Sequence, residues 1–102
     1  MTDTDLPWIT AVIPTRDRAD LVTRAVRSVL DQTYPNVDAV VVVDGPDPAT
    51  VAILTAMNEP RLRVISLDAN VGGSEARNIG VRRARGRWVA LLDDDEIGRA
   101  HV

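Results

Sequence analysis

The stretch Val37-Asp38-Ala39-Val40-Val41-Val42-Val43-Asp44-Gly45 decides the fold class of this 102-residue chain. Its four consecutive valines show no alternation of polar and apolar residues, a pattern typical of a parallel strand that is covered on both faces. Such strands occur in α/β proteins, where helices pack on each side of the sheet. We therefore predict a buried strand at residues 37–43, followed directly by a polar turn.

The segments on either side of this strand predict an alternation of strands and helices. Further apolar segments indicate strands at residues 8–13, 61–67 and 87–92. Apolar residues at helical spacing indicate helices at residues 20–32, 47–57 and 74–85. Asp47 and Pro48 suit the N-cap and the first position of the second helix. The order β-α-β-α-β-α-β predicts an α/β fold with a mostly parallel, Rossmann-like sheet and helices on both faces.

Composition limits the class of protein and the kind of site. The length and a hydrophobic content of 45% fit a single core. The absence of cysteine excludes disulfides and thiolate sites, so a metal would need oxygen ligands or His101. A net charge of −3 disfavours nucleic acid as a partner but is compatible with a small phosphate compound. No apolar stretch is long enough for a membrane segment and no leader pattern opens the chain, so we expect a cytoplasmic protein.

Ligands of parallel α/β sheets bind at the carboxyl ends of the strands. The expected strands bring four loops to that edge, at residues 14–18, 44–47, 68–74 and 93–95. Helices begin after three of these loops, and their N-terminal N–H groups favour an anion such as a diphosphate. The first strand is followed by no Gly-x-Gly-x-x-Gly and no P-loop motif, which disfavours a dinucleotide dehydrogenase or a P-loop NTPase.

Charged residues on these loops are candidates for a site. Three successive carboxylates at residues 93–95 suit Mg²⁺ or Mn²⁺, although a solvated acidic loop would show the same pattern. Asp44 could accept hydrogen bonds from a base or a sugar, or merely end its strand. Arg77 lies in the first turn of its helix, where a cation needs an anionic partner, either a phosphate or an aspartate of the same edge. Trp8 and Trp88 are most simply core or rim packing residues.

Four blocks in fixed order resemble the N-terminal portion of the family 2 glycosyltransferases, which have the GT-A fold. The resemblance covers residues 8–95 and rests on Val12-Ile13-Pro14-Thr15-Arg16-Asp17-Arg18, on Val41-Val42-Val43-Asp44-Gly45, on Asn70-Val71-Gly72-Gly73-Ser74-Glu75-Ala76-Arg77-Asn78, and on Leu91-Leu92-Asp93-Asp94-Asp95. The last block resembles the family's metal-binding Asp-x-Asp. In one departure, the family often has two acidic residues before the glycine, whereas this chain has Val43 at the first of those positions.

The resemblance implies an enzyme that transfers a sugar from a nucleotide-diphosphate sugar, such as a UDP-sugar, to a hydroxyl acceptor. The expected type is a metal-assisted, inverting hexosyltransferase. The implied nucleotide-binding residues are Pro14, Thr15, Arg16, Asp44, Gly73 and Arg77. The implied ligands of Mg²⁺ or Mn²⁺ are Asp93 and Asp95. The acceptor is not assigned.

Residues 8–95 are thus expected to form the donor-binding part of a truncated glycosyltransferase domain, preceded by a tail at residues 1–7. The last seven residues, 96–102, match one reading frame of a common sequencing-library adapter, so we expect a non-native tail there. The general base is expected beyond the end of this chain, and the chain alone is expected to be inactive.

Two other classes of protein share parts of this pattern. A nucleotidyltransferase on a similar sheet should carry a glycine-rich loop with Arg or Lys after its first strand, but residues 14–18 contain no glycine. A receiver-type signalling domain should carry an acidic pair after the first strand and a later lysine, and the chain has no lysine. Both are kept as alternatives to the glycosyltransferase.

Overall fold

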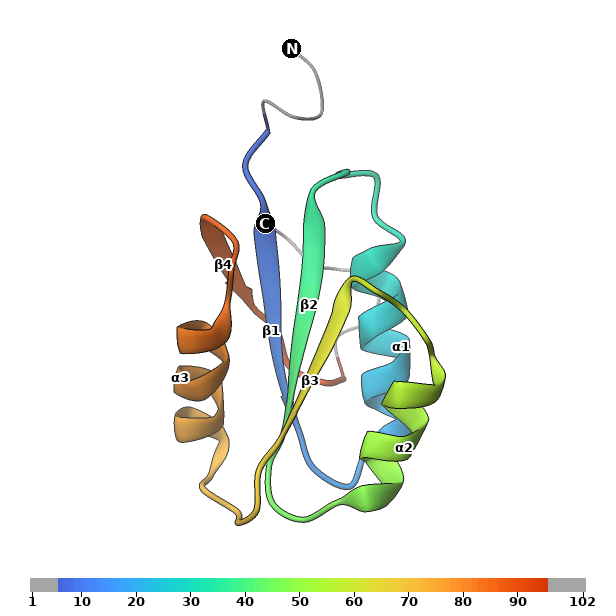
Figure 1. The fold of residues 1–102 in the computed structure, drawn as a ribbon, viewed down its shortest axis with the longest axis vertical. Coiled ribbons are helices and arrows are strands. Elements are labelled where there is room, and N and C mark those ends of the chain that lie inside the picture. Colours follow the sequence, from blue (N-terminus) through green and yellow to red (C-terminus); the bar gives the residue numbers. More distant parts are fainter. Residues whose placement is uncertain (1–5, 96–102) are drawn as a thin grey trace.

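The computed structural model describes residues 6–95, so the predicted tail at 96–102, His101 and most of the tail at 1–7 lie outside the described residues. Strands and helices alternate along the chain (Figure 1). The elements are β1 (Ile9–Thr15), α1 (Ala19–Leu30), β2 (Val37–Val43), α2 (Pro48–Ala56), β3 (Leu62–Ser66), α3 (Gly73–Arg83) and β4 (Trp88–Leu91). The predicted α/β alternation is confirmed. Within the described part of the chain, no helix is long and apolar enough to cross a membrane.

The four strands form one sheet in the order β3-β2-β1-β4, and every pairing is parallel. Ile9 of β1 lies opposite Val37 of β2 on one side and opposite Trp88 of β4 on the other. Helices α1 and α2 cover one face of the sheet and α3 covers the other (Figure 1). The sequence prediction of a parallel sheet with helices on both faces is therefore confirmed.

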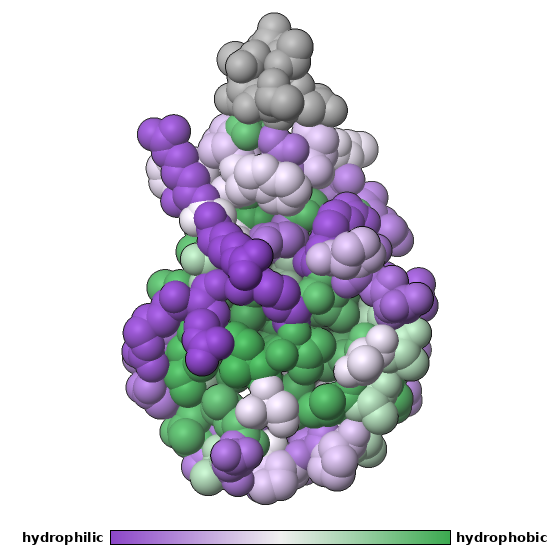
Figure 2. All heavy atoms as spheres, viewed as in Figure 1, coloured by the Kyte–Doolittle hydropathy of each residue, from purple (hydrophilic) through white to green (hydrophobic). Residues whose placement is uncertain are grey.

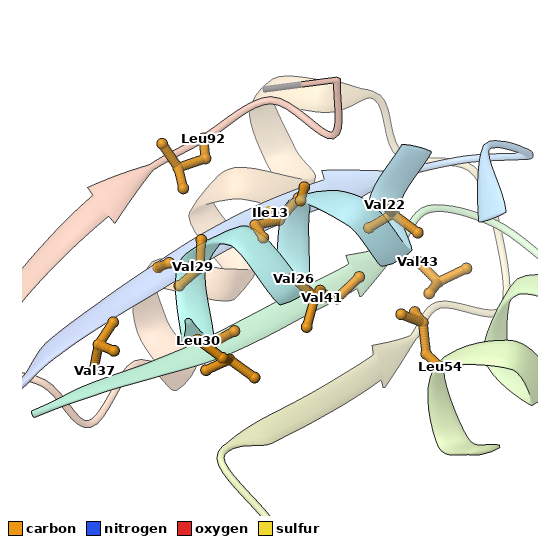
Figure 3. Packing of buried hydrophobic residues seen from close by; sticks show 13 residues of the cluster. Ile13, Val22, Val26, Val29, Leu30, Val37, Val41, Val43, Leu54 and Leu92 are labelled. Atoms are coloured by element: carbon orange, nitrogen blue, oxygen red, sulfur yellow. The ribbon is translucent and has the colours of Figure 1, made fainter. Parts of the chain in front are cut away.

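The valine run of β2 supplies core residues to both faces, as its pattern predicted. Val41 and Val43 belong to the larger cluster, which α1 and α2 complete with residues such as Val26 and Leu54 (Figure 3). Val40 and Val42 point the other way and pack with Ala76 of α3. Each valine is fully buried, because alternate side chains of a strand point to opposite faces and both faces are covered.

The first strand runs two residues further than predicted, through Pro14 to Thr15. Proline cannot donate to a neighbouring strand and usually interrupts a sheet. Here β4 pairs with β1 only as far as Val12, so the end of β1 has a partner on one side alone. The strand can therefore continue through Pro14, which carries Thr15 to the carboxyl edge.

The two edge strands differ in exposure, because β3 is mostly half-buried and β4 is mostly exposed. Trp88 and Leu91 of β4 point to opposite faces of the sheet and are 59% and 54% exposed, because α1 on one face and α3 on the other pack mainly on β1 and β2. Trp8 is also exposed, so neither tryptophan is a core residue, and only the interpretation as rim packing remains. At the opposite edge β3 faces the viewer in Figure 1, and Figure 2 shows hydrophobic side chains across the middle of that side.

Helix α3 approaches the sheet so closely that position 80 requires glycine. A Cβ at Gly80 would collide with Val12 and would lie 3.1 Å from Cγ2 of Val42. We expect Gly80→Ala to lower the free energy of unfolding by about 1–3 kcal/mol, the usual cost of overpacking, although alanine is the better helix former. Urea denaturation of the chain measures this. The matched control is Val81→Ala on the exposed side of α3, with a change within about 0.5 kcal/mol.

Helix α2 begins at an aspartate cap that also holds the loop after β1. Asp47 accepts hydrogen bonds from the backbone N–H groups of Thr50 at 3.2 Å and of Asp17 at 2.9 Å. The predicted N-cap is confirmed. Hydrogen bonding from Thr50, and then from the Asp17 amide, holds the pKa of Asp47 below its ordinary value. The carboxylate form is therefore the stabilising one.

Replacing this cap should cost stability in a pH-dependent way. We expect Asp47→Ala to lower the free energy of unfolding by about 1 kcal/mol at neutral pH. The loss should shrink as the pH falls below about 4. An aspartate whose pKa is lowered by folding stabilises the folded chain fully at pH values above the pKa of the unfolded chain, and this stabilisation disappears as the pH falls through the lower pKa of the folded chain. Denaturation at several pH values tests this, with the exposed Asp68→Ala as control. A constant difference down to the lowest pH would contradict it.

Candidate functional site

An open pocket of about 470 Å³ lies at the carboxyl edge of the sheet. Its lining comes from the ends of β1, β2 and β4 and from the first turns of α3: Pro14, Thr15, Arg16, Arg18, Asp44, Gly73, Arg77, Asp93, Asp94 and Asp95. All eight residues that the sequence assigned to a nucleotide or a metal are among them. The structure thus brings the assigned residues together, and it adds Arg18 and Asp94.

The pocket lies where the strand order reverses. Strands β2 and β3 are added on one side of β1, whereas β4 is placed on the other side, after α3 has crossed the opposite face. Loops that leave neighbouring strands toward opposite faces open a crevice at their carboxyl ends. Figure 1 shows the loops after β1, β2 and β3 together at the lower end of the sheet. The topology itself therefore provides the hollow.

Asp44 at the end of β2 holds the loop that precedes α3. Its buried carboxylate accepts hydrogen bonds from the N–H groups of Val71 at 2.7 Å and Gly72 at 3.0 Å. Gly45, with φ +92°, allows the two loops to meet, since a Cβ there would lie 3.3 Å from the Asn70 nitrogen. Carboxylate oxygens have further lone pairs, so Asp44 can accept from a ligand as well.

Arg77 lines the pocket next to the acidic turn at residues 93–95. One of its guanidinium nitrogens is 3.1 Å from Oδ1 of Asp93, and both side chains are partly exposed. Of the two partners that the sequence left open for Arg77, a phosphate or an aspartate of the edge, the structure shows the aspartate. An exposed pair of this kind contributes little to stability, so either member can change partner at small cost.

The acidic turn separates its three carboxylates. Asp93 and Asp95 are exposed to the pocket, whereas Asp94 is buried with 6% exposure. Asp94 accepts hydrogen bonds from Oγ1 of Thr15 at 2.9 Å and from the Arg18 guanidinium at 3.2 Å. The sequence pattern placed Asp94 only among the three carboxylates that suit a metal, and it gave Arg18 no role. The alternation of side chains after a strand was the available signal, because it sends the middle carboxylate away from its neighbours.

Arg16 stands on the β1 side of the pocket and leaves most of its side chain in solvent. The Nε atom of Arg16 lies 3.8 Å from Oδ2 of Asp17, which is near the upper limit of distance for an ion pair. Such a contact restrains a long side chain only weakly. Arg16 is therefore a positive charge that can move toward a ligand.

The residues present suit a divalent cation that a ligand helps to hold. Among residues 6–95, no group of three or more His, Asp or Glu side chains is arranged as a metal cage. Mg²⁺ is usually bound through one or two carboxylates together with waters and substrate phosphates. Asp93 and Asp95 can supply two carboxylates on the pocket side. This donor set fits a metal completed by phosphate oxygens.

Comparison with known proteins gives a family match. The family model described as glycosyl transferase family 2 matches residues 10–98. The succinoglycan biosynthesis protein ExoO of Rhizobium meliloti (strain 1021) is 44% identical over 94 residues, which are 92% of this chain and 27% of ExoO.

Solved structures give the same result. The mannosyltransferase PcManGT from Pyrobaculum calidifontis, in complex with GDP-Man and Mn²⁺, superimposes with a TM-score of 0.81 at 26% identity, over 93% of this chain and 29% of that one. S. aureus TarS 1-349 in complex with UDP superimposes with a TM-score of 0.74 at 26% identity, over 88% and 28%.

These matches share the GT-A fold and favour neither the nucleotidyltransferase nor the receiver alternative. The chain spans between about a quarter and a third of the length of the relatives named above. The family model covers nearly all of the described residues and matches the blocks that carry the resemblance. This chain belongs to the family 2 glycosyltransferases.

Proposed function

We propose that the pocket at the carboxyl edge binds the nucleoside diphosphate of a nucleotide-sugar donor, and that the whole protein transfers the sugar to a hydroxyl acceptor. The observation that carries this proposal is the pairing of Arg77 with Asp93 at the start of α3, because it places a cation and exposed carboxylates around one open hollow. The GDP-Man and Mn²⁺ of PcManGT and the UDP of TarS support the choice of ligand class.

The donor would be held by two parts of the pocket, the ends of β1 and β2 and the start of α3. Pro14 and Asp44, at the ends of β1 and β2, would flank the nucleobase and ribose. Thr15 lines the same side with its hydroxyl hydrogen bonded to Asp94. The diphosphate would lie toward Gly73, where the N–H groups of the first turn of α3 and the positive end of its dipole favour an anion. Arg16 would add a mobile positive charge on the opposite side.

Asp93 and Asp95 would hold a divalent cation, Mg²⁺ or Mn²⁺. When bound, the cation supplies positive charge that offsets the charge developing on the leaving diphosphate. Arg77 would leave Asp93 and donate its hydrogen bonds to the same phosphates, which stabilises the leaving group further. The exposed ion pair permits this exchange because little stability is lost when it opens.

Metal dependence is the first test of this proposal. We expect UDP or GDP to bind the chain at least about tenfold more tightly with Mn²⁺ than with EDTA, since Asp93 and Asp95 otherwise repel the phosphates. Asp95→Asn should abolish most of this difference. Isothermal titration calorimetry measures both values, and Asp31→Asn, an exposed aspartate outside the pocket, is the control. Equal affinity with Mn²⁺ and with EDTA would remove the metal role from this turn.

Arg77 provides the second test, because binding and stability should respond differently. We expect Arg77→Gln to weaken the binding of UDP or GDP by about 1.5–3 kcal/mol, the usual worth of a hydrogen bond to a charged group. The free energy of unfolding should change by less than about 1 kcal/mol, because the pair with Asp93 is exposed. Arg82→Gln breaks a similar exposed pair with Glu75 on the same helix and should leave binding unchanged.

A further inference from the structure

The end of β4 is fastened to the end of β1 by side chains rather than by backbone. The last backbone bond between the two segments runs from the Leu92 N–H to the Val12 carbonyl at 3.0 Å. Beyond that point β1 continues to Thr15, and the chain from β4 enters the acidic turn at residues 93–95. The Asp94 carboxylate bridges this gap, because it accepts from Thr15 and Arg18.

Of the two bonds to Asp94, the one from Thr15 is the better protected. Thr15 is buried, and its Oγ1 lies 2.9 Å from Oδ2 of Asp94. The Arg18 side chain is 56% exposed, so solvent screens its attraction for Oδ1. A buried carboxylate without partners would be costly, and these two donors remove much of that cost. Asp94 is therefore stable in the inward position only while its donors are present.

This arrangement fixes where the neighbouring carboxylates point. With Asp94 turned toward β1, Asp93 and Asp95 are left on the exposed side of the turn. The Thr15 hydroxyl has a single hydrogen, which it gives to Asp94, so this hydroxyl cannot at the same time donate to a ligand. The geometry thus offers a role for Thr15 that differs from direct contact with a nucleotide.

We propose that Asp94 is a positioning residue that, held by Thr15 and Arg18, locks the acidic turn so that Asp93 and Asp95 face the pocket. The effect on a bound cation rests on the proposed function, whereas the lock itself does not. Metal ligands need their supporting bonds, and losing such a bond typically weakens metal affinity by about 10–100-fold. Thr15 and Arg18 act on the site through Asp94.

The test separates the lock from its effect on binding. The first measurement is amide hydrogen exchange at residues 92–95 without ligand, in the wild type, Thr15→Val, Thr15→Ser and Thr23→Val. Thr23 is the matched control, because its hydroxyl donates to the Ala19 carbonyl within α1, away from the turn. We expect faster exchange in Thr15→Val alone, since serine keeps the donor. Unchanged exchange in Thr15→Val would overturn the lock.

The second measurement is the affinity for UDP and for GDP, each with Mn²⁺ and with EDTA. Thr15→Val should lose about 10–100-fold of affinity with Mn²⁺ and almost none with EDTA, and Thr15→Ser should restore the wild-type value. An equal loss in both conditions would show direct contact between Thr15 and the nucleotide and would overturn the positioning role. Unchanged affinity with Mn²⁺ in a variant with faster exchange would overturn it too.

A further pair of variants covers the case in which Thr15→Val does not fold. Arg18→Gln removes the exposed half of the lock, and Arg82→Gln is its control on a pair unrelated to the turn. Arg18→Gln should accelerate exchange at residues 92–95, and no change there would count against the lock. If the affinity of the wild type for each nucleotide is the same with Mn²⁺ as with EDTA, the proposed metal role fails. The exchange measurements still decide whether Asp94 locks the turn.

Discussion

The parallel pairing of β1 with β2 on one side and β4 on the other is the constraint on which the site depends. Parallel strands end at one edge of a sheet, so residues distant in sequence meet there without specific contacts to guide them. Thr15 and Asp94 are separated by 79 positions and still form a buried hydrogen bond. The hydrophobic burial of the β2 valines fixes this pairing, because the run has no polar face to leave in water.

Local signals were sufficient for the elements that the sequence predicted well. The valine run of β2 and the Asp47-Pro48 start of α2 each carry their information within a few residues, and the structure agrees with both. The continuation of β1 through Pro14 and the exposure of Trp88 depend instead on where β4 stops pairing and on which strands the helices cover. A single sequence carries no local signal for such neighbour relations.

The same distinction applies to the pocket. Its lining could be predicted, because any residue that follows a strand in this fold reaches the same edge. The partners of its charges could not, since they depend on side chains brought together across the sheet. Asp44 accepts from the amides of the loop before α3, and Asp94 accepts from the loop after β1. The sequence pattern assigned Asp44 no role toward that loop, and it placed Asp94 only among three carboxylates that suit a metal.

These internal partners explain how a pocket with four carboxylates could take an anionic ligand. Four unpartnered negative charges around one hollow would repel a diphosphate strongly. Backbone amides satisfy Asp44, and Thr15 and Arg18 satisfy Asp94, so only Asp93 and Asp95 remain exposed. Arg77 partly neutralises Asp93. A ligand that brings a divalent cation would therefore meet two carboxylates facing the metal, while Arg77 becomes free for the phosphates. On the proposed function, the burial of Asp44 and Asp94 therefore leaves Asp93 and Asp95 to hold the divalent cation.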